Sequence, residues 1–227
     1  MCFTVSLKSD QKKTEKRFNA KFAEPKNIKP IFYSNAFTHP DHPIITNDNP
    51  EIIINAVWGL IPPWAKNIDI QNHTCNARAE TIYQKPSFKH AAKSNHCLVL
   101  VDGFYEWQEF KGKKYPYYIY KKDEEPFSLA GLWEPWTNPD TGEIIKTFTI
   151  ITCEANELLA KIHNTKKRMP VILTSQNEKK WLEGKAELES YKGHDLKAHT
   201  VSKLITARGV ERNVPEAIKP FTYKELG

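Results

Sequence analysis

Residues 96–107 read HCLVLVDGFYEW, an apolar run that ends at Asp102-Gly103 and is followed by aromatic residues around Glu106. Runs of β-branched and aromatic residues that are punctuated by Gly, Pro or Asn are typical of strands. The stretch therefore predicts a buried strand over His96–Val101, followed by a carboxylate held among bulky rings. Desolvation in such surroundings would perturb the pKa of Glu106 unless a cation lies nearby. The alternative is that Glu106 is an outward-facing residue of an alternating strand.

Segments on both sides add strands and short helices. Runs of the same kind predict four more strands, at Ile52–Trp58, Tyr117–Lys121, Phe127–Leu132 and Thr147–Thr152. The helical pattern is clearest at Ala79–Tyr83 extending toward Lys93, at Glu154–Ile162 and at Asn177–Gly184. We also expect a solvated helix or loop over residues 9–29, an irregular but ordered segment over 31–45 and a final strand at 201–205 (VSKLI).

The organisation of the chain points to one domain. A length of 227 residues with 40% hydrophobic residues is enough to bury a sizeable core. No period of 20–50 residues repeats, and no low-complexity linker divides the sequence. We therefore expect a single α+β domain over residues 1–227, built on mostly antiparallel sheets.

Charge and hydropathy restrict the cellular setting. Thirty-three Lys and Arg against 27 Asp and Glu give a net charge of +6, which suits a polyanionic partner but is also common among soluble proteins. No stretch approaches the ~20 apolar residues that a membrane-spanning helix needs, and the N-terminus lacks the pattern of a secretion signal. We expect a cytoplasmic protein without a membrane partner, and a monomer.

The cysteines and histidines do not predict a metal site or disulfides. Cys2, Cys75, Cys97 and Cys153 are scattered without a Cys-x-x-Cys pair. His73 lies near Cys75, and His39 near His42, but neither pair is matched by a second one at zinc-ligand spacing. The chain also contains no Gly-rich phosphate loop and no Gly-x-Ser-x-Gly motif. No cofactor or metal is expected.

Cys2 is the most informative position. An initiator Met that precedes a small residue is normally removed, and removal of Met1 would leave a free α-amine beside a free thiol. Such an amine can condense with an aldehyde to an imine, and the thiol can then close a thiazolidine ring. Alternatively, the thiol could be a nucleophile that uses its own amine as base, as in N-terminal-nucleophile hydrolases. The remaining alternative is that Cys2 is an ordinary small residue in a frayed N-terminus, without a chemical role.

Two loop motifs suggest contacts with nucleic acid. The segment Val57–Trp64 (VWGLIPPW) holds two tryptophans beside a Pro-Pro turn, which would stack on unpaired bases if exposed or form a hydrophobic corner if buried. The sequence NARAET (76–81) reads as a loop entering a helix, where Arg78 could bind phosphate and Asn76 could orient a reacting group. A capping segment with a surface ion pair is the alternative.

A third motif adds a titratable group near a basic run. His163 ends a helix-like stretch, and Lys166-Lys167-Arg168 and an apolar segment follow it. A histidine there could transfer protons near neutral pH. A capping or surface histidine beside a solvated turn is the plainer interpretation.

The order of these motifs resembles that of one family. Met1-Cys2, WGLIPPW (58–64), NARAET (76–81), LVDGFYEW (100–107), LAGLWE (129–134), ITCEAN (151–156), Ile162-His163 and RMPVIL (168–173) follow one another along the chain. Together they are similar to the SRAP family, the abasic-site processing proteins first named SOS response-associated peptidases. The resemblance runs from Cys2 to about Phe221.

The resemblance implies a fold and a set of roles. The fold would be α+β, with branched, mostly antiparallel sheets, a small barrel and flanking helices. Cys2 would be the covalent residue, Asn76 its positioning partner, Glu106 the group beside the amine and His163 the proton-transfer group. DNA-binding residues would be Arg78, Trp58, Pro62, Trp64, Lys166, Lys167 and Arg168.

Two departures from the family pattern affect the basic residues. Cys2 is followed by Phe3-Thr4 where the family has Gly-Arg, so the arginine that reaches a phosphate is missing. Three extra residues separate His163 from Arg168-Met169-Pro170. Lys8, Lys12 and Lys13 are the candidates to replace the first cation, and Lys166 and Lys167 are the candidates to take the place of Arg168 at the DNA backbone.

The resemblance implies covalent capture of abasic sites in single-stranded DNA through Cys2, in the SOS response to DNA damage. It also implies some lyase activity through the imine, and association of the protein with the nucleoid when it is bound to DNA. The alternative is a thiol peptidase or amidohydrolase, whose only substrate could be its own Met1–Cys2 bond. A third hypothesis is a non-covalent single-strand binding module.

Overall fold

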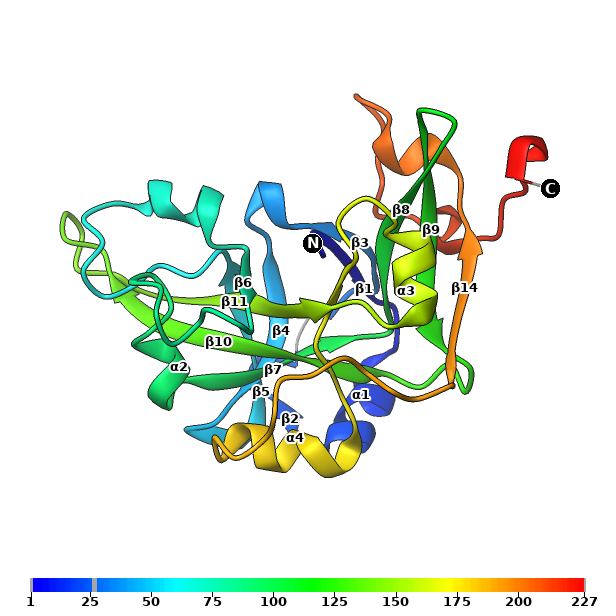
Figure 1. The fold of residues 1–227 in the computed structure, drawn as a ribbon. Helices are drawn as coiled ribbons and strands as arrows, with labels where there is room; N and C mark the ends of the chain where they lie inside the picture. Colours follow the sequence, from blue (N-terminus) through cyan, green and yellow to red (C-terminus); the bar gives the residue numbers. More distant parts are fainter. Residues whose placement is uncertain (1, 26–27, 227) are drawn as a thin grey trace.

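The computed structural model describes residues 2–25 and 28–226, and it has an α+β fold with mostly antiparallel sheets, a small barrel and flanking helices (Figure 1). One sheet contains β14-β9-β8-β1-β3, in that order. The other follows β12-β11-β10-β7-β4-β5-β2, with β6 and β13 attached to β11 and β10. Most pairings are antiparallel, and the parallel ones are β11 with β5, β11 with β6 and β2 with β5.

The bounds of the elements are as follows. The first sheet comprises β1 (Thr4–Leu7), β3 (Ile31–Asn35), β8 (Gly103–Phe110), β9 (Lys113–Lys121) and β14 (Leu196–Thr200). The second comprises β2 (Lys21–Phe22), β4 (Asp41–Thr46), β5 (Asn49–Trp58), β6 (Asn76–Arg78), β7 (His96–Val101), β10 (Phe127–Thr137), β11 (Ile144–Glu154), β12 (Arg168–Pro170) and β13 (Ile172–Leu173). The α-helices are α1 (Gln11–Phe18), α2 (Ala91–Ser94), α3 (Glu157–Ile162) and α4 (Ser175–Leu182), and the 3-10 helices are η1 (Ala36–Thr38), η2 (Ile68–His73), η3 (Lys203–Thr206), η4 (Pro215–Ile218) and η5 (Lys224–Leu226).

The stretch HCLVLVDGFYEW joins the two sheets. Its first half is β7, between β4 and β10 in one sheet, and its second half is β8, between β1 and β9 in the other. The change of sheet occurs at Asp102, whose carboxylate accepts hydrogen bonds from the Ser9 backbone N–H and hydroxyl, both at 2.7 Å. Gly103 follows because a Cβ there would lie 2.5 Å from the Tyr118 ring.

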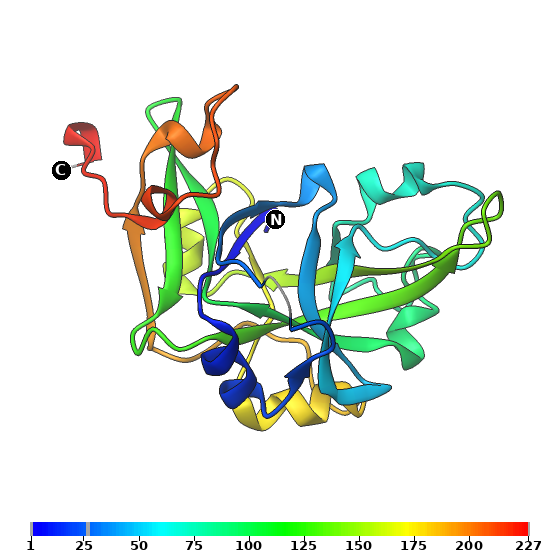
Figure 2. The same ribbon diagram turned by 180° about the vertical axis from the view of Figure 1, so that it is seen from behind.

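Strand β1 brings the N-terminal end of the chain into the interior. It pairs with β3 on one side and with β8 on the other, with Thr4 opposite Asn35 and Val5 opposite Phe104. Figures 1 and 2 show this end near the middle of the molecule, between the two groups of strands. A terminus in the middle of a sheet is held firmly, unlike most chain ends.

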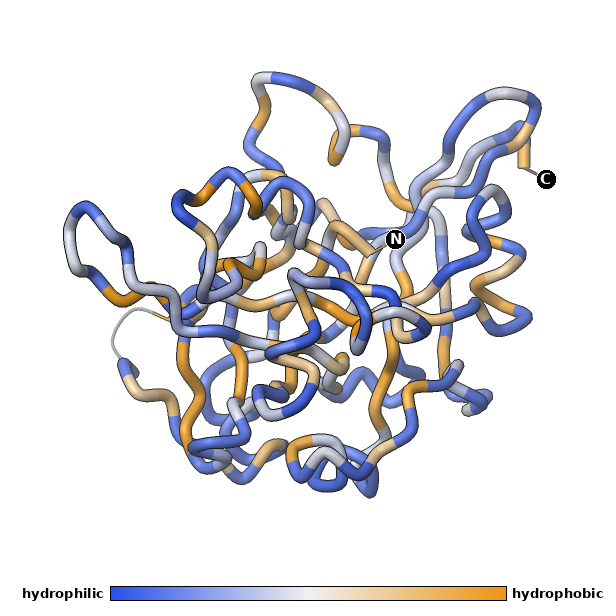
Figure 3. The backbone as a smooth tube through the Cα atoms, turned by 60° about the vertical axis from the view of Figure 1, so that its left-hand side comes forward, coloured by the Kyte–Doolittle hydropathy of each residue, from blue (hydrophilic) through white to orange (hydrophobic). Residues whose placement is uncertain are grey.

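The apolar residues of the strands form the core. In Figure 3 the hydrophobic colour follows the inner strands, whereas the outer loops are hydrophilic. Helix α4 packs against β7, β10 and β13, and its Trp181 is buried with Nε1 donating to the Cys97 carbonyl oxygen at 3.0 Å. Among the described residues, no helix is long and apolar enough to cross a bilayer.

The five strands predicted between residues 52 and 152 are confirmed, β7 with its predicted bounds and the others with different ones, and so are the helices near residues 154–162 and 177–184, with different bounds. The helix expected over Ala79–Lys93 is wrong, because turns follow β6 directly and occupy residues 79–90, and the chain is helical only from the start of α2. Pro86 lies in these turns and cannot donate a helical hydrogen bond.

Two other expectations are also wrong. Residues 31–45 are ordered strands on either side of η1, and their two prolines obscure the alternation that marks a strand. Residues 201–205 lead into the 3-10 helix η3, and the last strand, β14, comes just before them. The expected helix or loop over 9–29 contains α1, with Asp10 capping its N-terminus through the Lys13 N–H, and then β2.

Candidate functional site

Cys2 lies in the interior, just before β1. Its side chain has no exposed surface, and its Sγ lies 3.8 Å from the Thr4 carbonyl oxygen. Burial raises the pKa of the thiol far above its ordinary value, and the nearby carboxyl group of Glu106 raises it further. The thiol is therefore protonated at neutral pH. The expected removal of Met1 concerns a residue outside the described part of the chain.

Glu106 is carried by β8, the neighbour of β1, and is buried. Val5 pairs with Phe104, and continuing this antiparallel register places Phe3 opposite Glu106. Burial raises the pKa of the Glu106 carboxyl group from its ordinary value of 4.5 to about 8. The protonated form therefore predominates at neutral pH, so the group can donate a proton.

His163 follows α3 and faces Glu106. Its Nδ1 lies 2.9 Å from the Arg168 carbonyl oxygen and 3.5 Å from Glu106 Oε2. A carbonyl can only accept, so Nδ1 carries the proton in this contact and Nε2 carries the lone pair. Burial lowers the pKa of the imidazole, and the ammonium groups of Lys166 and Lys114 lower it further. His163 is thus a neutral base at neutral pH.

These two side chains line a pocket of about 390 Å³. Its walls come from the start of the chain, the β8–β9 hairpin and the loop after α3: Phe3, Glu106, Trp107, Glu109, Lys114, His163, Thr165 and Lys166. Phe3 also stacks on Phe37, with ring centroids 4.6 Å apart, and the Phe37 ring is 61% exposed. The pocket thus brings together an acid (Glu106), a base (His163), two lysines and Phe3, which stacks on Phe37.

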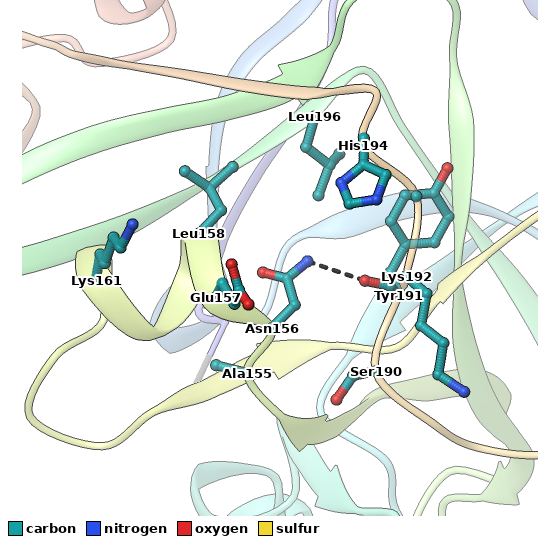
Figure 4. Close-up of a pocket in the computed structure, with 11 residues that line it drawn as sticks. Ala155, Asn156, Glu157, Leu158, Lys161, Ser190, Tyr191, Lys192, His194 and Leu196 are labelled. Carbon is teal, nitrogen blue, oxygen red and sulfur yellow. Dashed lines mark hydrogen bonds between the residues drawn. The ribbon is translucent and has the colours of Figure 1, made fainter.

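A larger hollow of about 730 Å³ lies elsewhere, between the start of α3 and residues 190–196 (Figure 4). There the Asn156 side chain caps α3 by accepting from the Leu159 N–H and donates to the Tyr191 carbonyl oxygen at 2.9 Å. None of the side chains predicted to be catalytic lines it. Size alone therefore does not identify the site.

Asn76 begins β6 and presents a buried amide. Both polar atoms of its side chain lack a hydrogen-bond partner among the described residues. The preceding Cys75 contacts the Ala36 carbonyl oxygen through Sγ at 3.7 Å, and the Ala36 N–H donates to the Phe3 carbonyl oxygen at 2.8 Å. This link ties the start of β6 to the residue after Cys2. An unsatisfied buried amide is costly, and active sites are where such groups occur.

The predicted basic residues fall into two groups. Arg78 is exposed at the end of β6, without an ion pair among the residues described, although the helix expected to follow it is absent. Lys166 lines the pocket, and Lys167 lies exposed in the same loop. Arg168 instead forms a two-pronged ion pair with Glu80 and donates to the Thr152 carbonyl oxygen at 2.7 Å. Its guanidinium is thus engaged within the protein.

The aromatic loop is only partly at the surface. Trp58 has no exposed surface, stacks on Phe148 and donates from Nε1 to the Cys75 carbonyl oxygen at 2.8 Å. Pro62 is also buried, whereas Trp64 is 57% exposed. The expectation that Trp58 and Pro62 face DNA is therefore corrected: they support the loop from inside, because the end of β5 runs into the core.

Five residues that line the pocket were not among the site residues predicted from the sequence: Phe3, Trp107, Glu109, Lys114 and Thr165. The replacement of Gly-Arg by Phe3-Thr4 marks the first. Lys114 could have been predicted to face the opposite side from Lys113, because residues 113–121 (KKYPYYIYK) form a strand and successive side chains of a strand face opposite sides of the sheet. Within the described residues, no group of three His, Cys, Asp or Glu side chains could hold a metal ion.

Comparisons with known proteins identify relatives of this chain. A family model described as SOS response associated peptidase (SRAP) matches residues 1–214. The abasic site processing protein YoqW of Bacillus subtilis is 40% identical over 199 residues, which cover 80% of this chain and 86% of YoqW. The abasic site processing protein HMCES of Gallus gallus is 33% identical over 233 residues, which cover 89% of this chain and 66% of HMCES.

The fold is similar to that of a crystallised protein from Bacteroides thetaiotaomicron. The two superpose with a TM-score of 0.89 at 34% identity, over 97% of this chain and 100% of the other. Since the family model spans almost the whole sequence, the chain belongs to the SRAP family.

Proposed function

We propose that this protein processes DNA containing abasic sites, and that it captures such sites in single strands as a covalent thiazolidine through Cys2 after Met1 is removed. The observation that carries the proposal is the burial of Cys2 near Glu106, which faces His163 at a pocket with basic side chains. Its relatives in Bacillus subtilis and Gallus gallus are named abasic site processing proteins. We further propose that residues 1–227 act as one monomeric domain in the cytoplasm.

The first step is attack of the Cys2 amine on the aldehyde carbon of the ring-opened sugar. A C–N bond forms, and both N–H protons finally leave with the aldehyde oxygen as water, which gives an imine. His163, neutral because of its lowered pKa, accepts one proton from the nitrogen and returns it to the departing oxygen. Burial favours the protonated form of Glu106, which can exchange a proton with the reacting groups.

The second step is ring closure by the thiol. The S–H bond breaks as sulfur bonds to the imine carbon, and its proton moves to the imine nitrogen, so no atoms are gained or lost. The raised pKa of the Cys2 thiol supports this order, since a protonated thiol is a poor first nucleophile. The same property disfavours a thiol peptidase, which needs a thiolate.

The remaining site residues position the DNA and the adduct. We assign Asn76, with its unsatisfied amide, to alignment of the adduct, Arg78 to a backbone phosphate and Trp64 to stacking on an unpaired base. The imine acidifies the neighbouring carbon of the sugar, so slow β-elimination of the 3′ phosphate is expected as a minor lyase activity. Self-removal of Met1 would use the same acid and base.

The test is intact mass of the purified protein, followed by a denaturing gel after incubation with a single-stranded oligonucleotide that carries one abasic site. We expect loss of Met1 and a shifted band that is absent with Cys2→Ala. Cys2→Ser keeps the amine but not the thiol, so it should give an adduct only after borohydride reduction. A processed protein that forms no adduct would overturn the proposal.

A further inference from the structure

Two lysines from separate elements line the pocket that contains Glu106 and His163. Lys114 lies on β9, and Lys166 lies in the loop between α3 and β12. Both residues are exposed, and neither ammonium group has an ion pair or hydrogen bond within the described parts of the chain. Both lie close enough to the imidazole of His163 to affect its ionisation. Two unengaged cations therefore flank the reactive groups.

The loop that carries Lys166 is held in place by the β8–β9 hairpin. The Asn164 side chain accepts from the Glu109 backbone N–H at 3.0 Å and donates to the Glu109 carbonyl oxygen at 2.8 Å. Gln108 adds a hydrogen bond from Nε2 to the Lys161 carbonyl oxygen at 3.2 Å. Because Glu109 pairs with Lys114 across the hairpin, these contacts determine where the two lysines lie relative to each other.

The arginine of the RMPVIL motif is engaged elsewhere. Arg168 binds Glu80 and Thr152 through its guanidinium, while its carbonyl oxygen accepts the hydrogen bond from His163. Thr165 and Lys166, in the loop before Arg168, form part of the pocket lining. The cation at the pocket is therefore a different residue from the arginine whose carbonyl oxygen accepts from His163.

We infer that Lys114 and Lys166 together bind the backbone phosphodiester that flanks the captured sugar, so that Lys114 is a DNA-binding residue of this site. The inference rests on the proposed function. Ammonium groups act on phosphate as point charges with three donors each, so two of them on separate walls can hold one phosphate. Glu109 at the same pocket is the competing charge, but its carboxylate forms no ion pair with either lysine in the described structure.

The inference is tested with an oligonucleotide that cannot form a covalent bond. A single strand with one tetrahydrofuran abasic analogue lacks the aldehyde, and its affinity is measured by fluorescence anisotropy over a series of salt concentrations. Each lost phosphate contact should reduce the slope of log K against log salt by about 0.7. We expect the slope to be reduced by this amount in Lys114→Gln and in Lys166→Gln. In the double variant the reduction should be no larger than the sum of the two, because both lysines contact one phosphate.

Lys113→Gln is the matched control, because Lys113 precedes Lys114 on the same strand, faces the other way and does not line the pocket. Lys114→Arg should retain the slope. The inference is overturned if the slope of Lys114→Gln equals that of the wild type, or if Lys113→Gln lowers it equally. A slower reaction of Lys114→Gln with free 2-deoxyribose, which has no phosphate, together with an unchanged salt slope would also overturn the inference, because Lys114 would then act through His163. Failure of the wild type to crosslink would overturn the proposed function instead.

Discussion

The buried carboxyl group of Glu106 should make the protein less stable as the pH rises, and Glu106→Gln should remove this loss. Burial holds the pKa of this group at about 8 in the folded protein, against 4.5 for an unperturbed glutamate. An acid with a raised pKa favours folding while it is protonated. The contribution is therefore complete below about pH 4.5 and is lost progressively as the pH rises toward 8.

The two pKa values determine the size of the effect. Ionisation of Glu106 opposes folding by about 1 kcal/mol at pH 5 and by about 3 kcal/mol at pH 7. A glutamine has nearly the same shape and does not ionise, so the stability of Glu106→Gln relative to the wild type should rise by about 2 kcal/mol between these pH values. Capture of abasic DNA should slow in the same variant, because the group that controls the protonation of the amine is lost.

The assay is urea unfolding of the Met1-processed protein, followed by tryptophan fluorescence at pH 5, 6 and 7. Glu109→Gln is the control, because it makes the same change at an exposed carboxylate of the same pocket. For Glu106→Gln the difference in unfolding free energy from the wild type should grow with pH, whereas for the control it should stay constant. A difference for Glu106→Gln that is flat or falls with pH would refute the argument.

Three more outcomes are expected. Asn76→Ala should change the unfolding free energy by less than about 1 kcal/mol, since the amide has no partner to lose among the described residues, while the rate of adduct formation falls; a large loss of stability by urea unfolding would contradict this. Trp64→Ala should weaken single-strand binding by about 1–3 kcal/mol in anisotropy, and an equal effect of Tyr83→Ala, another exposed ring, would show that the stacking is not specific. Glu80→Gln breaks an ion pair at a half-exposed carboxylate, so it should lower the unfolding free energy by less than about 1 kcal/mol. It should slow capture of abasic DNA by loosening the Arg168 backbone, whose carbonyl oxygen orients His163. An unchanged capture rate would show that the Glu80–Arg168 pair does not support the site.

Local patterns predicted the strands well because their signal is carried by neighbouring residues. His96–Val101 was found with its observed bounds, since the run is apolar throughout and ends at a glycine that the packing requires. The segment after Arg78 was misread for the opposite reason. Its turns depend on parallel pairing of β6 with β11, which joins residues more than 70 positions apart, and no local pattern reports such a pairing.

The reactive residues could be named from motif order, but their arrangement could not. Phe3, Glu106 and His163 line one pocket only because β1 enters the sheet between β3 and β8. The assignment of Trp58 to a DNA-facing surface was wrong for the same reason. The motif contains two tryptophans, and only the three-dimensional arrangement determines that Trp58 is buried and Trp64 exposed. The engagement of Arg168 by Glu80 likewise depends on the position of β12 beside β11, which the sequence does not reveal.

Burial has the same kind of effect on the ionisation of each reactive side chain in the site. It raises the pKa of the Cys2 thiol and of Glu106 and lowers that of His163, so all three groups are shifted toward their neutral forms. A neutral thiol, acid and base can exchange protons without leaving an isolated charge in a medium of low dielectric constant, where such a charge would be costly. The charges are kept at the edge instead, on Lys114 and Lys166, where they can face a phosphate. This division between a neutral interior and a cationic rim suits an electrophile that is itself uncharged but is attached to a polyanion.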